Sequence, residues 1–160
     1  YFQFKRNFFK DLNWGKKEFE EIINFLENKY KKVVFSADIE KNEYDEYFEK
    51  NYSFIDFEDN FSFVETNNKK TIYLKKIDPI NLFHIINNAN KILSPHGLIT
   101  QISYLLNKES INLFNFKITN LKDYHHQKIS FSEWYSNMGI KFLFLNNDIK
   151  KSLRKIAKFV

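Results

Sequence analysis

The feature of the sequence that most restricts its fold is an alternation of short apolar segments with longer amphipathic ones. The short segments have the length and the aromatic or β-branched content of strands. The longer segments place apolar residues at the spacing of one helix face, as Phe19, Ile22, Ile23 and Leu26 do within 16–30. Strands that alternate with helices favour right-handed crossovers and therefore a largely parallel sheet.

This alternation predicts an α/β fold, Rossmann-like and doubly wound, with a mainly parallel sheet in three α/β/α layers. A short strand is also expected near 53–56, and loops are expected at 6–15 and 115–130. The main strands are expected at 1–5, 32–37, 71–74, 91–94, 110–114 and 141–145, and the helices at 16–30, 40–50, 78–89, 98–106, 130–139 and from 147 to the end.

Two of these helices have buried faces that the sequence predicts in detail. Asp78 and Pro79 suit the start of the third helix, because Asp can cap free amides and Pro is tolerated at the first helical position. The next helix is expected to bury Leu98, Ile99, Ile102, Leu105 and Leu106. The last helix is expected to bury Ile149, Leu153, Ile156 and Val160, with its lysines and Arg154 facing outward.

Length and composition limit the class of protein. A chain of 160 residues with 43% hydrophobic residues predicts one α/β domain over 1–160 with a proper core. The net charge of +5 permits a phosphate-bearing ligand or an anionic surface without requiring either, and no nucleic-acid partner is predicted. The absence of cysteine excludes disulfides and Cys-ligated zinc.

No apolar run reaches the length of a membrane span, and no secretory signal is visible. These features predict a cytoplasmic location. The basic face of the last helix would also allow peripheral contact with the inner membrane. The chain opens on Tyr1 without a Met, which we interpret as a domain cut from a longer protein, with a tag remnant as the alternative.

The turn Ser94-Pro95-His96-Gly97 is the most informative candidate site. It joins a predicted strand to a helix N-terminus, where free amides and the helix dipole favour a phosphate. Gly97 would let the ligand approach the backbone, and Ser94, His96 and Thr100 would add hydrogen bonds. The alternative interpretation is a structural turn with an exposed His96.

Basic residues after the first strand, Lys5, Arg6 and Lys10, would lie beside this turn and could meet a diphosphate. The alternative for each of them, and for Lys75 and Lys76, is ordinary solvated charge. His125 and His126 have no further ligand at a recognisable spacing, so no metal site is predicted. No Walker loop, GxGxxG or GxSxG motif is present, which argues against a classical dinucleotide cofactor, and no cofactor is predicted.

The order of elements in 71–114 resembles the C-terminal half of bacterial GT-B glycosyltransferases, most closely the heptosyltransferase family (glycosyltransferase family nine). That family has a basic-ended strand, a helix, a strand, an Asp-Ser-Gly-x-x-His turn and a strand ending in Leu-Phe-Gly. Here Pro95, His96, Gly97 and Thr100 stand at the turn, so only the glycine is kept. Pro-His-Gly is also similar to a turn of family-61 glycosyltransferases. The first loop up to Trp14 fits the family's opening as well.

This resemblance implies the nucleotide-sugar donor-binding domain of a glycosyltransferase of bacterial cell-surface polysaccharide or lipopolysaccharide synthesis. It implies that a separate N-terminal domain carries the glycan or lipid-linked acceptor site and usually the catalytic base, so no catalytic residue is assigned here. The chain would then be the C-terminal half of a two-domain enzyme and inactive alone. The alternatives are a non-enzymatic α/β interaction module and a different nucleotide-binding enzyme that uses NAD or ATP.

Overall fold

The computed structural model describes residues 1–36, 46, 49–50, 55–58, 61–65, 71–75, 77–115 and 137–159. Its strands are β1 (Phe2–Gln3), β2 (Val33–Ser36), β3 (Ile55–Glu58), β4 (Phe61–Glu65), β5 (Thr71–Lys75), β6 (Ile92–Pro95), β7 (Ser110–Asn115) and β8 (Lys141–Leu145). Its helices in these ranges include α1 (Arg6–Lys10), α2 (Lys16–Lys29), α4 (Pro79–Asn88), α5 (Leu98–Leu105) and α7 (Ile149–Ile156).

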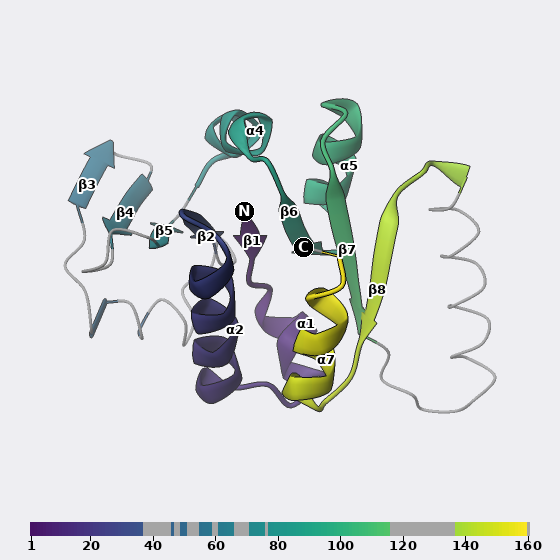
Figure 1. Ribbon diagram of the computed structural model, residues 1–160. Coiled ribbons are helices and arrows are strands. Elements are labelled where there is room, and N and C mark those ends of the chain that lie inside the picture. Colours follow the sequence, from purple (N-terminus) through teal and green to yellow (C-terminus); the bar gives the residue numbers. More distant parts are fainter. Residues whose placement is uncertain are drawn as a thin grey trace.

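The strands form one 8-stranded sheet in the order β3-β4-β5-β2-β1-β6-β7-β8 (Figure 1). All neighbours from β5 to β8 in this order are parallel. β3 and β4 extend the β5 edge in antiparallel pairing. Counted along the chain, the parallel strands have the doubly wound order 3-2-1-4-5-6. The predicted mainly parallel, Rossmann-like fold is therefore confirmed.

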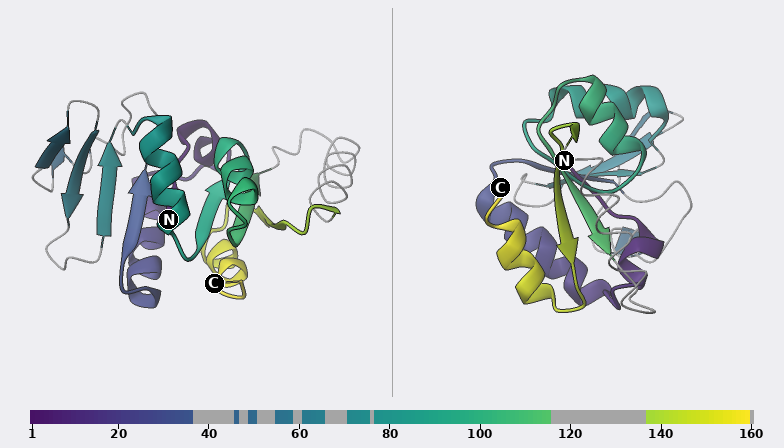
Figure 2. Two further views of the ribbon diagram at one scale, coloured as in Figure 1. Left: turned by 90° about the horizontal axis from the view of Figure 1, so that it is seen from above. Right: turned by 90° about the vertical axis from the view of Figure 1, so that its right-hand side faces the viewer.

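Helices cover both faces of this sheet (Figure 2). On one face, α1, α2 and α7 enclose an apolar cluster that is rich in phenylalanine. On the other face, α4 and α5 pack over a smaller cluster built from Leu82, Ile86, Ile92, Ile99 and Ile102. The strands contribute apolar residues mainly to the first cluster. Ile92 of β6 belongs to the second cluster, on the opposite face from Leu93, as the period of two in a strand requires.

Local sequence explains the helices that were predicted. The apolar stripe of α2 is buried at all of the expected positions, Phe19, Ile22, Ile23 and Leu26. Asp78 caps α4 by accepting hydrogen bonds from the amides of Ile80 at 2.9 Å and Asn81 at 3.0 Å. Asp148 caps α7 in the same way, through the amide of Lys151 at 3.1 Å.

The predicted loop at 6–15 is wrong in part, because it contains α1. Three apolar side chains in this stretch, Phe9, Leu12 and Trp14, are fully or almost fully buried. Burial of these side chains, rather than an amphipathic repeat, holds the segment against the sheet. Trp14 also donates from its indole Nε1 to the carbonyl of Asn147, at 3.3 Å.

The predicted buried face of α5 is also partly wrong. Leu98 and Leu105 are 53% and 77% exposed, whereas Thr100 and Ser103 are buried beside Ile99 and Ile102. Each buried hydroxyl has a hydrogen-bond acceptor: Thr100 donates to Asn112 Oδ1 and Ser103 to the Ile99 carbonyl. Satisfied hydroxyls can occupy a core position at little cost, so the helix turns its leucines outward.

The last helix follows its prediction closely, with one difference. Ile149 and Ile156 are buried, while Leu153 is partly buried against the same cluster. Lys155 does not face outward as predicted, because its Nζ donates to the carbonyl of Phe144 at 3.0 Å. The helices expected near 40–50 and 130–139 lie almost wholly outside the described residues, and so do His125, His126, Lys76 and Val160.

At the amino-terminal edge of the sheet, Glu109 joins two strands by ion pairs. Its carboxylate lies 2.6 Å from the Nζ of Lys91, ahead of β6, and 2.6 Å from that of Lys141 on β8. Hydrogen bonds from Lys141 and Lys91 lower the pKa of Glu109 from 4.5 to about 2. A lowered folded-state pKa adds stability above the unfolded value, and this stability is lost as the pH falls from about 4.5 towards 2.

We therefore expect Glu109→Gln to destabilise the domain at pH 7 and to have little effect near pH 2. The Glu109 side chain is 39% exposed, so solvent screening limits the loss at pH 7 to about 1 kcal/mol or less. Urea unfolding of both proteins at several pH values measures the difference, with Glu21→Gln as a control outside the ion pairs. An equal loss at pH 7 and pH 2 would show that the effect is not electrostatic.

Candidate functional site

The candidate site lies at the carboxyl edge of the sheet, between β1 and β6. The chain builds the sheet outward from β1 through β2 to β5, and then crosses to β6 on the other side of β1. In open α/β sheets this change of direction opens a crevice that commonly binds ligands. Lys5 follows β1 at this edge, and the His96-Gly97 turn follows β6.

Lys5 and the turn are in direct contact. The Lys5 Nζ donates a hydrogen bond to the carbonyl of His96, at 3.2 Å. A Cβ on Gly97 would lie 2.5 Å from the same Nζ, and Gly97 has a φ of +152°, a conformation that favours glycine. The glycine therefore lets the ammonium group lie directly against the backbone of the turn.

His96 forms one wall beside this contact. Its ring is stacked on Phe114, with centroids 5.4 Å apart and an interplanar angle of 20°. Burial, and secondarily the charge of Lys5, lower the pKa of His96 below its usual 6.5. The imidazole is therefore neutral near pH 7, and a neutral ring offers one hydrogen-bond donor and one acceptor.

The turn leads into the N-terminus of α5. The first amides of a helix generally lack partners within it, and the helix dipole places partial positive charge there. The amide of Thr100 already donates to the carbonyl of Gly97 at 3.0 Å, so Leu98 and Ile99 supply the amides that have no partner among the described residues. Thr100 supports the turn, because the amide of Gly97 donates to its Oγ1 at 3.4 Å and that hydroxyl donates to Asn112. Ser94 is fully buried, and its hydroxyl has no hydrogen-bond partner within the described residues.

The register also aligns the predicted Ser94 with three polar side chains that the sequence interpretation did not assign to the site. The adjacent strands β2, β1, β6 and β7 carry Ser36, Gln3, Ser94 and Asn112 side by side. Their neighbours along each strand, Phe2 among them, point into the phenylalanine-rich cluster, so this polar row faces α4 and α5. The sequence did contain a signal for this row, because several predicted strands have a polar residue near their end that alternates with the apolar residues.

The predicted site residues therefore separate into groups. His96 and Gly97 meet Lys5 at the switch point, whereas Ser94 and Thr100 lie buried beneath it. Arg6 begins α1 directly after Lys5, but its side chain is outside the described part of the structure. Lys10 is exposed at the far end of α1, and no hydrogen bond or ion pair in the described residues joins it to the turn.

The described residues show no group of three or more His, Asp or Glu side chains that could hold a metal ion. None of the helices in the described ranges combines the length and the apolar character that crossing a membrane requires. Comparison of the chain with protein-family models, curated proteins and solved structures found no match. The resemblance to glycosyltransferases thus stays a prediction from the sequence.

The arrangement at the switch point has one clear chemical capability. A lysine ammonium, the amides of a helix N-terminus and a neutral imidazole all lie at the same sheet edge. Each can donate a hydrogen bond, and the first two carry positive charge or partial positive charge. Such a set is suited to an anionic ligand, phosphate groups in particular.

Proposed function

We propose that this chain is the nucleotide-sugar donor-binding domain of a glycosyltransferase. In this proposal, the diphosphate of the donor binds between Lys5 and the N-terminus of α5. The observation that carries the proposal is the contact of Lys5 with the His96-Gly97 turn at the switch point of a doubly wound sheet. The sugar-transfer part rests on the sequence resemblance, in which the donor-contacting turn has the same place in the order of elements.

The role of these groups in transfer would be to stabilise the leaving nucleoside diphosphate. As the bond between the sugar and the diphosphate breaks, negative charge grows on the phosphate oxygens. A fixed ammonium group and helix-end amides can stabilise that charge without a bound metal. The acceptor and the catalytic base are assigned to a partner domain, and the reaction would belong to bacterial cell-surface polysaccharide synthesis in the cytoplasm or at the inner membrane.

The test is a titration of UDP, GDP, ADP and CMP, followed by backbone amide NMR. We expect one diphosphate to shift the amides of 97–100, with CMP binding more weakly. Lys5→Met should weaken that binding about tenfold, because it removes the ammonium but keeps the apolar stem. Lys150→Met, at an exposed position on α7, is the charge-matched control and should leave it unchanged.

A second variant tests the turn itself. Gly97→Val places side-chain atoms where the Lys5 ammonium lies and strains the backbone, so the binding of the same nucleotide should be abolished. If millimolar nucleotides move no amide at the turn, the proposed site is wrong. If the protein binds no nucleotide at any other position either, the non-enzymatic interaction module replaces the glycosyltransferase as the favoured function.

A further inference from the structure

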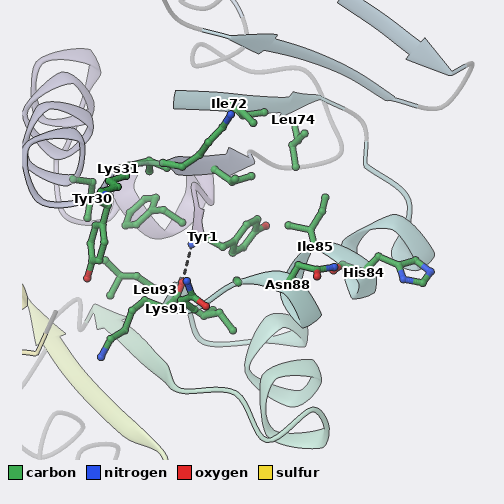
Figure 3. Close-up of a pocket in the computed structure, with 18 of the residues that line it drawn as sticks. Tyr1, Tyr30, Lys31, Ile72, Leu74, His84, Ile85, Asn88, Lys91 and Leu93 are labelled. Atoms are coloured by element: carbon green, nitrogen blue, oxygen red, sulfur yellow. Dashed lines mark hydrogen bonds between the residues drawn. The ribbon is translucent and has the colours of Figure 1, made fainter. Parts of the chain in front are cut away.

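A cavity of about 730 Å³ lies at the opposite edge of the sheet from Lys5 and His96 (Figure 3). This volume is within the range of sites that bind small molecules. It is bounded by α4 on one side and by the amino-terminal parts of β1, β2 and β6 on the other, with β5 beside them. Nothing in the proposed nucleotide site uses it.

The interior of the cavity is mainly apolar. Its walls include the ring of Tyr1 and aliphatic side chains from three strands, β2, β5 and β6, and two helices, α2 and α4. Figure 3 shows Ile72 and Leu74 on the sheet side, Ile85 on α4 and the Tyr1 ring between them. Transfer of an apolar chain from water into such a space is favourable, in proportion to the apolar surface removed from water.

The rim carries positive charge. Lys31 and Lys32 precede β2, and Lys91 precedes β6, so all three lie at the same edge. Lys31 is exposed and forms no ion pair within the described residues. Lys91 shares Glu109 with Lys141, so this cluster of two lysines and one carboxylate keeps a net positive charge.

A tyrosine lies beside these lysines. The ring of Tyr30 lines the cavity, whereas its hydroxyl oxygen is buried away from the accessible space and has no hydrogen-bond partner among the described residues. Burial, followed by the charge of Glu109, raises the pKa of Tyr30, so the phenol keeps its proton and remains a donor. In Figure 3, Tyr30 and Lys31 lie together on the side of the cavity away from α4.

We propose that this cavity binds an anionic amphiphile with a single apolar chain, of the fatty-acid type. The chain lies between α4 and the sheet, and the carboxylate lies beside the rim lysines. Charge complementarity selects this ligand: an apolar interior alone would accept any hydrophobic molecule, whereas lysines at one end of it favour an anionic head group. The site is independent of nucleotide binding, because it lies at the other edge of the sheet.

The test uses dodecanoate below its micelle concentration as the probe, with methyl and amide NMR as the readout. Dodecanoate should bind at micromolar concentration and shift the methyl groups of Ile72, Leu74 and Ile85. Dodecyltrimethylammonium, with the same chain and the opposite charge, should bind at least tenfold more weakly. Acetate, which has the head group without the chain, should cause no shift at these methyl groups.

Two pairs of variants locate the ligand. Ile85→Trp fills the cavity and should weaken dodecanoate binding at least tenfold, whereas Ile80→Trp, at a position of α4 that is 72% exposed, should not. Lys31→Glu should weaken binding several-fold, and Lys17→Glu, an exposed control on α2, should not.

The proposal is overturned if dodecanoate moves none of these methyl groups in the unmodified protein, or if the cationic probe binds equally well. This measurement does not depend on whether Ile85→Trp folds. Nucleotide titration reports on the amides of 97–100 instead, so a failure of either proposal leaves the other one separately measurable.

Discussion

Replacing Phe9 with alanine is expected to lower the free energy of unfolding by about 3–5 kcal/mol. Phe9 is fully buried, and its ring lies 4.5 Å from Phe4, 4.8 Å from Phe8 and 5.5 Å from Trp14, measured between ring centroids. Its loss would leave a cavity that these rigid rings cannot close. It would also release α1 from the sheet edge that carries Lys5.

Urea unfolding followed by far-UV circular dichroism measures this loss. Phe83→Ala is the matched control, because Phe83 is 41% exposed on α4, and we expect a change below about 1 kcal/mol there. A loss below about 1 kcal/mol for Phe9→Ala would mean that α1 is not part of the cooperative core.

The second large effect is expected at the C-terminal helix. Ile156 is 1% exposed within the phenylalanine-rich cluster, so Ile156→Ala should cost about 2–5 kcal/mol. Leu153 lies one turn earlier and is only partly buried, so Leu153→Ala should cost less than Ile156→Ala. The sequence pattern alone treats the two positions as equivalent.

Unfolding curves of the two variants under the same conditions provide the comparison. The reverse order, with the larger loss at Leu153, would indicate that α7 is docked through a different face from the one in the structure. A loss below about 0.5 kcal/mol for both variants would indicate that α7 is only loosely attached to the domain.

Much of this fold follows from local patterns in the sequence. The stripe on α2 and the Asp78-Pro79 start of α4 act within one or two helical turns, and both are confirmed. α1 was missed because five residues are too few for a helical period to show, and burial of Phe9 holds it in place. The strand β4 was missed because it is defined by its antiparallel pairing with β3 and β5, and a local sequence pattern does not predict which strands pair.

The candidate site was predictable to the extent that it depends on the turn. Ser94-Pro95-His96-Gly97 does connect β6 to α5, as the pattern of a strand followed by a helix indicated. The contact of Lys5 with this turn spans 91 positions in the chain and results from the placement of β1 beside β6. The sequence interpretation offered Arg6 and Lys10 as well as Lys5. The structure places Lys5 at the turn and Lys10 at the far end of α1, and the placement of β1 beside β6, which local sequence does not encode, brings this segment to the turn.

The central position of β1 has a consequence for how the domain is made. β1 contains two residues and lies between β2 and β6, so the middle of the sheet joins the start of the chain to a strand that begins at Ile92. During synthesis β1 can pair with β2 early, but its other edge has no partner until β6 has left the ribosome. Non-local pairing of this kind slows folding and exposes an unpaired edge to aggregation. We therefore expect nascent chains that end before Ile92 to depend on chaperones.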